Sequence, residues 1–252
     1  MLSKQQLAFI RSLHQKKFRQ MYGKFLVEGD KLVRELLHSG FKIDAIYSVN
    51  DWQMTSHTPD ESPDNQLKHV FISENELKKI STHETPNQVV AVVDIPKPKP
   101  GAIYTKLNTG LYLACDVLND PGNAGTIIRT AEWFGVDAIF FSENSVDIYN
   151  PKVVNAAKGS LFRIPCYYED LGNIFEANRH LSVYGTFMDG ENIYESNLDK
   201  NAFVLIGNEA NGISHELTPF IHHRISVPAF GKAESLNAGV ATGVVLAEFR
   251  RR

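Results

Sequence analysis

One stretch of the sequence decides the fold: Phe203-Val204-Leu205-Ile206-Gly207-Asn208-Glu209-Ala210-Asn211-Gly212-Ile213-Ser214. Its first four residues are apolar without polar alternation, which is typical of a parallel strand that is covered on both faces. The strand then breaks into a loop, where Gly207 and Gly212 permit backbone conformations or close approaches that are closed to other residues. Glu209 lies between the two glycines. Because ligands bind at the carboxyl ends of strands in such sheets, we expect this loop to face a ligand crevice.

Similar short apolar segments surround this stretch, and helical segments separate them. The expected strands are residues 111–115, 138–141, 182–187, 203–206 and 224–227. The clearest helix covers residues 151–158, with Asn150 as its cap, and a last helix with several small residues covers residues 236–249. This alternation predicts an α/β fold with a mainly parallel sheet over residues 111–252.

Residues 1–95 predict a separate, smaller α/β unit. Ser3 and Gln6 have the spacing of a capping box, and apolar residues then recur at helical spacing, which predicts one helix over residues 3–22. Further helices are expected at residues 30–38 and 74–80, strands at 25–27, 45–49, 70–72 and 89–93, and a loop at 50–67. Three prolines between Pro96 and Pro100 predict a linker over residues 96–110, and a surface loop inside one domain is the alternative.

The composition is that of an ordinary globular protein, with 252 residues, of which 43% are hydrophobic and 22% charged. No apolar run approaches the roughly 20 residues needed to span a bilayer, and the basic N-terminus lacks the apolar segment of a signal peptide. We therefore expect a cytoplasmic protein. Cys115 and Cys166 have no CxxC partner, so we interpret both as buried thiols, and the histidines show no metal-ligand spacing.

The net charge of −3 is unevenly distributed along the chain. Residues 1–34 contain eight Lys or Arg and two acidic residues, so this segment carries +6 and the other 218 residues carry −9. A concentrated basic patch attracts phosphate even on a mildly acidic molecule, and a solvated helix face is the alternative interpretation.

Two further strand ends are rich in Gly, Asn and ionisable residues. The first is Asp116-Val117-Leu118-Asn119-Asp120-Pro121-Gly122-Asn123-Ala124-Gly125-Thr126-Ile127-Ile128-Arg129, in which a helix is expected to begin near Asn123. The second is Val227-Pro228-Ala229-Phe230-Gly231-Lys232-Ala233-Glu234-Ser235-Leu236-Asn237, which leads into the last helix. Taken alone, Asn123, Ser235 and Asn237 would be read as helix caps and Arg129 as a surface cation.

The three segments together resemble the three motifs of the SpoU (TrmH-like) RNA 2′-O-ribose methyltransferases of the SPOUT superfamily. The motifs are Asn-x-Gly-x-x-x-Arg, then Gly-Asn-Glu-x-x-Gly, then Val-Pro-x-x-Gly-x-x-Glu-Ser-Leu-Asn. The resemblance covers about residues 111–252, and residues 1–95 look more loosely similar to an L30e-like substrate-binding domain. It implies an S-adenosyl-L-methionine site, a deep trefoil knot, and a homodimer through the C-terminal domain with the active site near the interface.

By motif position, the resemblance also assigns roles to residues. The catalytic candidates are Asn123, Arg129, Glu209, Ser235 and Asn237, and the cofactor-binding candidates are Leu205, Ile206, Gly207, Val227, Pro228 and Leu236. Because a guanidinium keeps its proton, Arg129 is expected to stabilise the developing alkoxide and not to act as a plain base. The candidate RNA-binding residues are Arg11, Lys16, Lys17, Arg19 and Lys24, which would contact phosphates of structured RNA, with rRNA favoured over tRNA. No metal is expected to take part in this chemistry.

Two other functions remain open. A non-catalytic RNA-binding or ribosome-assembly protein can keep the same fold, although the joint presence of all five catalytic candidates disfavours it. A nucleotide-dependent oxidoreductase is also an α/β protein, but Gly122-Asn123-Ala124-Gly125 lacks the GxGxxG spacing of a dinucleotide site.

Overall fold

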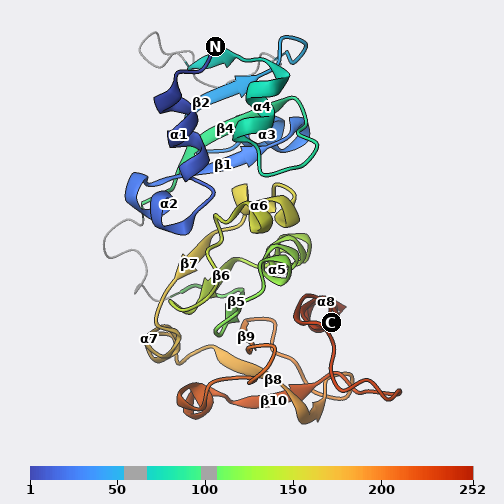
Figure 1. Cartoon of the computed structure of the whole chain (residues 1–252). Coiled ribbons are helices and arrows are strands. Elements are labelled where there is room, and N and C mark those ends of the chain that lie inside the picture. Colours follow the sequence, from blue (N-terminus) through green and yellow to red (C-terminus); the bar gives the residue numbers. More distant parts are fainter. Residues whose placement is uncertain (54–66, 98–106, 252) are drawn as a thin grey trace. The chain divides into compact units, whose positions relative to one another are not determined.

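The computed structural model describes residues 1–53, 67–97 and 107–251. The chain forms two compact units, each with one β-sheet (Figure 1). The N-terminal unit contains residues 1–97 and 147–162, and the C-terminal unit contains residues 98–146 and 163–252. The bounds 1–95, 96–110 and 111–252 remain a prediction, to which the structure adds that residues 147–162 group with the N-terminal unit. Most of the expected loop at 50–67 and of the expected linker lies outside the described residues.

The C-terminal unit is built on a six-stranded sheet in which every neighbouring pair of strands is parallel. In spatial order the strands are β10 (His223–Ser226), β8 (Ser182–Asn192), β9 (Ala202–Ile206), β5 (Leu111–Cys115), β6 (Ala138–Phe141) and β7 (Cys166–Tyr168). The predicted parallel α/β architecture is therefore confirmed. Sequence reasoning missed β7, whose three residues are half-buried and do not form an apolar run.

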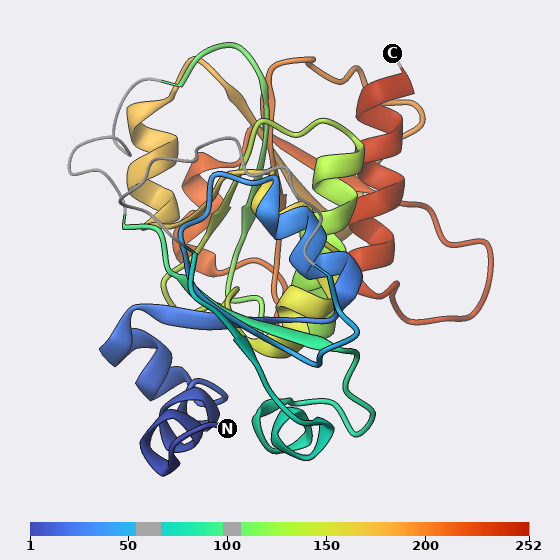
Figure 2. The ribbon, with the colours of Figure 1, turned by 90° about the horizontal axis from the view of Figure 1, so that it is seen from above.

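Helices cover both faces of this sheet (Figure 2). The helix α7 (Leu171–Ala177) and the 3₁₀ helix η2 (His215–Phe220) pack on one face, where Phe175 and Leu217 join the core around Phe203. The helices α5 (Pro121–Trp133) and α8 (Ala238–Arg251) lie side by side on the other. They approach closely, because a Cβ added to Gly239 would lie 2.8 Å from Cγ2 of Thr126.

The N-terminal unit has a four-stranded mixed sheet. Its strands, in spatial order, are β1 (Lys24–Glu28), β4 (Val89–Asp94), β2 (Ile43–Ser48) and β3 (His69–Phe71), and the β2–β3 pair is the parallel one. The helices α1 (Lys4–Ser12) and α4 (Glu74–Ile80) pack through a shared apolar core, while α3 (Asp30–Leu37) contacts β1 and β4. The helix α6 (Pro151–Ala157), which is followed by the 3₁₀ helix η1 (Ser160–Phe162), packs against β1. Among the described helices, none combines the length and the apolar character needed to cross a membrane.

The expected single helix over residues 3–22 is wrong, because the chain forms two helices, α1 and α2 (Lys16–Tyr22). The capping box at Ser3 is confirmed. The helix breaks where the Arg19 guanidinium binds the carbonyl oxygens of Leu13 and His14, with Nη1 at 2.9 and 2.8 Å from them. In an uninterrupted helix those oxygens would accept from the backbone four residues later.

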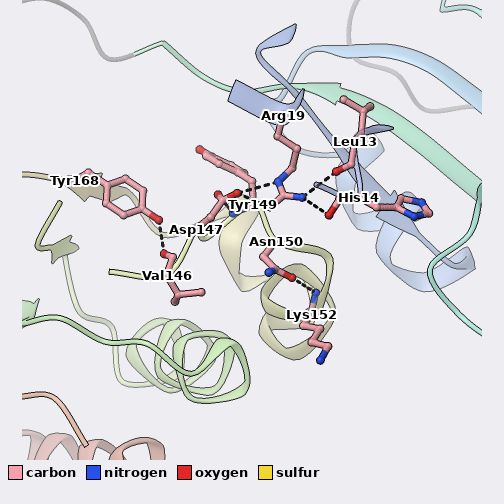
Figure 3. A network of polar contacts seen from close by, with 9 residues as sticks. All are labelled: Leu13, His14, Arg19, Val146, Asp147, Tyr149, Asn150, Lys152 and Tyr168. Carbon is pink, nitrogen blue, oxygen red and sulfur yellow. Dashed lines mark hydrogen bonds and ion pairs between the residues drawn. The ribbon is translucent and has the colours of Figure 1, made fainter. Parts of the chain in front are cut away.

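Arg19 is also the residue for which the expected contact with RNA must be corrected. Its side chain is only 2% exposed, and Nε and Nη2 donate to Oδ2 of Asp147 at 2.8 and 2.7 Å (Figure 3). Lys24 is likewise engaged, because its ammonium group forms ion pairs with Asp44 and Asp94. Both cations therefore bind protein groups; Arg19 is too buried to reach a phosphate, whereas the contact of Lys24 with RNA stays a prediction.

We predict that Asp147→Ala lowers the free energy of unfolding by about 3–5 kcal/mol, because it leaves the buried Arg19 guanidinium without its counter-charge. The matched control is Asp189→Ala, which removes an exposed ion pair with Arg224 and should cost no more than about 1 kcal/mol. Urea denaturation followed by circular dichroism measures both values. Equal losses for the two variants would contradict a structural role for the Arg19–Asp147 pair.

Candidate active site

Three loops that are remote in sequence meet through one chain of side-chain hydrogen bonds. Nδ2 of Asn123 donates to Oε1 of Glu209 at 2.9 Å, and Nδ2 of Asn237 donates to Oδ1 of Asn123 at 2.7 Å. Each residue comes from a different one of the three segments that the sequence singled out. The three segments therefore converge at Asn123, Glu209 and Asn237.

Two helix caps orient this chain of hydrogen bonds. Asp120, and not Asn123, caps α5, because its Oδ1 accepts from the backbone N–H of Asn123 at 2.7 Å. The Asn123 side chain is thereby left to reach the other two loops. Asn237 has both roles, since its Oδ1 also accepts from the backbone N–H groups of Gly239 and Val240 at the start of α8.

The loop that carries Glu209 is tied to the end of β5. The buried carboxylate of Asp116 accepts from the backbone N–H of Ser214 at 2.7 Å, and Nδ2 of Asn208 donates to the Val117 carbonyl at 2.7 Å. Oδ1 of Asn208 accepts from the backbone of Ala210 and Asn211, which closes the turn around Glu209. Val117 has a φ of 48°, a strained conformation for a β-branched residue, and such strain persists where the surroundings enforce it.

These loops surround a cavity of about 970 Å³ within the C-terminal unit. Four of the five catalytic candidates line it, namely Asn123, Glu209, Ser235 and Asn237. Five of the six cofactor-binding candidates also line it, namely Ile206, Gly207, Val227, Pro228 and Leu236. A cavity of this size, largely apolar with a few polar groups, is typical of a small-molecule site.

Two predicted residues do not reach the cavity. The Leu205 side chain is fully buried in the core on the opposite side of β9 and does not line the cavity, so its contact with a cofactor stays a prediction for its backbone alone. Arg129 is exposed on α5, does not line the cavity, and has no hydrogen-bond or ion-pair partner among the described residues. The helical period explains this placement, because six residues separate Arg129 from Asn123 and turn it to another face of α5.

Sequence reasoning missed one wall of the cavity, which Thr186, Phe187 and Met188 of β8 provide. The expected strand ended at residue 187, whereas β8 continues to Asn192. The Arg224 guanidinium lies 3.6 Å from the centroid of the Phe187 ring and also pairs with Asp189. Neither contact follows from a motif, because the strands β8 and β10 must first be paired.

The ionisable residues that line the cavity are both acidic. They are Glu209 and Glu234, and no Lys or Arg is among the described residues that line it. The two cysteines are free; Cys115 is buried as predicted, whereas the residue Cys166 is half-buried. Burial of the sulfur raises the pKa of both thiols, that of Cys166 to about 12, so they are protonated at neutral pH. Among the described residues, no group of three or more His, Cys, Asp or Glu could hold a metal ion. The cavity is thus suited to a ligand with an apolar body and a positive charge.

Comparison with known proteins agrees with the geometry. A model described as the SpoU rRNA Methylase family matches residues 110–247, and one described as an MRM3-like substrate binding domain matches residues 4–91. The chain belongs to the SpoU rRNA methylase family. The sequence prediction of the family is therefore confirmed.

Individual relatives span nearly the whole chain. The 23S rRNA (guanosine(2553)-2′-O)-methyltransferase RlmP of Bacillus subtilis is 32% identical, over 95% of this chain and 94% of its own. The structure of an AdoMet-bound rRNA methyltransferase from Sinorhizobium meliloti has a TM-score of 0.88 at 28% identity, covering 100% of this chain and 97% of its own. A TrmH-family protein from Porphyromonas gingivalis has a TM-score of 0.86 at 35% identity, covering 100% and 99%. The α/β fold with its parallel six-stranded sheet thus matches SPOUT methyltransferase structures.

We predict that Gly207→Ala distorts the loop of the second SpoU motif. A Cβ at this position would lie 2.4 Å from the Gly212 carbonyl carbon, so the variant should lose about 1–3 kcal/mol of unfolding free energy. Gly231→Ala is the matched control in the third loop, because its Cβ would meet no atom within 4 Å. Urea denaturation of both variants tests this, and a Gly207→Ala variant as stable as Gly231→Ala would show that the loops are not tightly packed.

Proposed function

We propose that this protein uses S-adenosyl-L-methionine to methylate ribose 2′-hydroxyl groups of structured RNA, and that its substrate is ribosomal RNA and not transfer RNA. The observation that carries the proposal is that hydrogen bonds link Glu209, Asn123 and Asn237 at one cavity. The protein that contains them belongs to the SpoU family. The preference for rRNA rests on the Bacillus subtilis relative, which is named as a 23S rRNA methyltransferase.

The residues of the cavity fit this cofactor. S-adenosyl-L-methionine has a flat apolar adenine and a positively charged sulfonium, and the cavity offers apolar side chains together with Glu209 and no lining Lys or Arg among the described residues. Ile206, Val227 and Leu236 supply apolar surface, and Gly207 brings the backbone close to the ligand. When bound, the cofactor supplies a methyl group from its sulfonium, which becomes a neutral thioether.

The protein residues would act by positioning and by electrostatics. A ribose 2′-oxygen would accept this methyl group, and its hydroxyl proton would leave to a phosphate or to water. Asn123, Ser235 and Asn237 orient the reacting groups, while Glu209 holds Asn123 in place. Arg129 stabilises the developing alkoxide, because a guanidinium remains charged and provides several donors.

The position of Arg129 fits a homodimer with the active site near its interface. Arg129 and Trp133 are four residues apart, on one exposed face of α5, and the Trp133 side chain is 82% exposed. A large apolar side chain with this exposure marks an interaction surface when it lies in a patch, and Val240 of the adjacent α8 is also exposed. We propose that this face of α5 and α8 joins two copies of the chain, which brings Arg129 to the interface.

The deep trefoil knot and the cytoplasmic location belong to the same proposal. Family membership supports the knot. A crystal structure in which the main chain passes through no loop would refute the knot. Ribosomal RNA as the substrate requires the protein to reside where ribosomes are made.

We predict that the purified protein transfers radiolabel from S-adenosyl-L-[methyl-³H]methionine to unmodified 23S rRNA, and that nuclease digestion recovers the label as 2′-O-methylnucleoside. Arg129→Ala should reduce transfer by about 100- to 1,000-fold, the effect of removing one preorganised donor. Cofactor affinity, measured by calorimetry, should stay nearly unchanged, because Arg129 does not line the cavity.

Three outcomes would count against these assignments. Cofactor binding without transfer to any RNA would favour a non-catalytic RNA-binding or ribosome-assembly role. Binding of NAD instead of S-adenosyl-L-methionine would favour an oxidoreductase. Loss of both transfer and cofactor binding in Arg129→Ala would refute the role given to Arg129.

We predict that Trp133→Glu converts the dimer to a monomer in sedimentation velocity experiments, because it places a charge in an apolar contact. Phe71→Glu is the matched control, since it changes an exposed aromatic residue of the N-terminal unit. Wild-type protein that sediments as a monomer would exclude the proposed dimer. A dimer that persists in Trp133→Glu would move the interface away from α5.

A further inference from the structure

The first 27 residues combine positive charge with exposed aromatic and apolar side chains. They contain six Lys or Arg and no Asp or Glu. Two of these cations, Arg19 and Lys24, are engaged in ion pairs, and four remain exposed, namely Lys4, Arg11, Lys16 and Lys17. Of the four exposed large hydrophobic residues among the described part of the N-terminal unit, three lie in this segment, namely Met1, Met21 and Tyr22.

An aromatic cluster joins the two N-terminal helices. The ring of Tyr22 meets Phe9 of α1 edge-on, with centroids 5.1 Å apart, and is stacked with Phe18 of α2 at 6.3 Å and an interplanar angle of 15°. The ammonium group of Lys17 lies 5.9 Å from the centroid of the Phe18 ring. Phe9 and Phe18 are half-buried, whereas Tyr22 is 42% exposed and Met21 beside it is 70% exposed. The rings of Phe9 and Phe18 therefore support the ring of Tyr22, which is open to solvent.

The cluster is held in a fixed position from two directions. The backbone N–H of Leu2 donates to Oε1 of the buried Glu76 at 2.6 Å, which anchors the start of α1. The buried Arg19 anchors α2 through its ion pair with Asp147 (Figure 3). A rigid aromatic surface loses little entropy when a flat ligand stacks on it.

We propose that Tyr22, supported by Phe9 and Phe18, is a stacking site for an unpaired base of RNA, and that Lys16, Lys17 and Arg11 bind the phosphates beside it. Stacking on aromatic side chains together with cations along the backbone is how proteins bind single-stranded nucleic acid. A cationic segment without Asp or Glu disfavours a basic partner, and the flat ring favours a base over a bare phosphate. The inference rests on the proposed function and names the part of its RNA substrate that the N-terminal unit recognises.

The test uses the full-length protein and an RNA hairpin with a single-stranded oligouridine tail, compared with the same hairpin without the tail. Tyr22→Leu should weaken binding of the tailed hairpin by about 5- to 100-fold, the range that stacking of one base supplies. Tyr22→Phe should keep most of the affinity, because it keeps the ring. Phe71→Leu, which changes an exposed aromatic residue away from the cationic segment, should bind as the wild type does.

The cations are tested through salt dependence. The double variant Lys16→Gln, Lys17→Gln should reduce the slope of log affinity against log salt by about 0.7 for each phosphate that the variant no longer neutralises, whereas Tyr22→Leu should leave the slope unchanged. Equal affinity of wild type and Tyr22→Leu for the tailed hairpin would overturn the proposal. So would an equal loss in Phe71→Leu, or a preference for anionic lipid vesicles over the tailed RNA.

Failure of this inference is separable from failure of the proposed function. If the wild type methylates rRNA but Tyr22→Leu binds the tailed hairpin normally, the stacking site is wrong and the enzyme assignment stands. If the wild type binds the hairpin through Tyr22 but transfers no methyl group, the RNA site stands and the proposed activity is wrong. Melting temperatures of Tyr22→Leu and Tyr22→Phe show whether a loss of binding reflects unfolding.

Discussion

The parallel register of β5 and β9 is the constraint on which the site depends. Cys115 pairs with Ile206, so both strands end at the same level and their loops leave the sheet at one edge. The backbone N–H of Asp116 still donates to the Ile206 carbonyl at 2.8 Å, which extends the pairing by one step. Beyond that point no backbone hydrogen bonds among the described residues pair the two strands, and side chains of the loops make the contacts between them. Asn123 can therefore meet Glu209 although 86 residues separate them.

The sequence was informative wherever a single periodicity or a local cap decides the structure. Apolar runs located β5, β6 and β9 to within a residue, and the capping box at Ser3 marked the true start of α1. The same reasoning failed where a remote partner decides. The break between α1 and α2 depends on Arg19, whose own position depends on Asp147, and 128 residues separate the two. No short segment of the sequence contains both Arg19 and Asp147, so local sequence patterns could not predict the break.

The residues of the candidate site also fall into those that local sequence patterns predict and those that they do not. Residues that face the cavity through a loop backbone, such as Gly207 and Pro228, follow from motif spacing alone. Leu205 and Arg129 do not, because each lies in a regular element whose period sets its direction. Adjacent residues of a strand point to opposite faces, so Leu205 enters the core while Ile206 lines the cavity. The cavity wall formed by β8 could not be predicted from the sequence for another reason. Phe187 reaches the loops only because β8 pairs with β9 and β10.

Charge counted along the sequence overstated what the N-terminal segment offers to RNA. A guanidinium that is 2% exposed and paired with Asp147 contributes rigidity to α2 and releases no counterion when RNA binds. Lys24, held between two carboxylates, likewise offers little. The cost of burying Arg19 is offset by its ion pair with Asp147 and its hydrogen bonds to the backbone, while Lys16, Lys17 and Met21 of the same helix remain exposed. At the proposed stacking site, a few free cations beside a fixed aromatic surface would discriminate between paired and unpaired RNA, which a larger but mobile set of charges would attract equally.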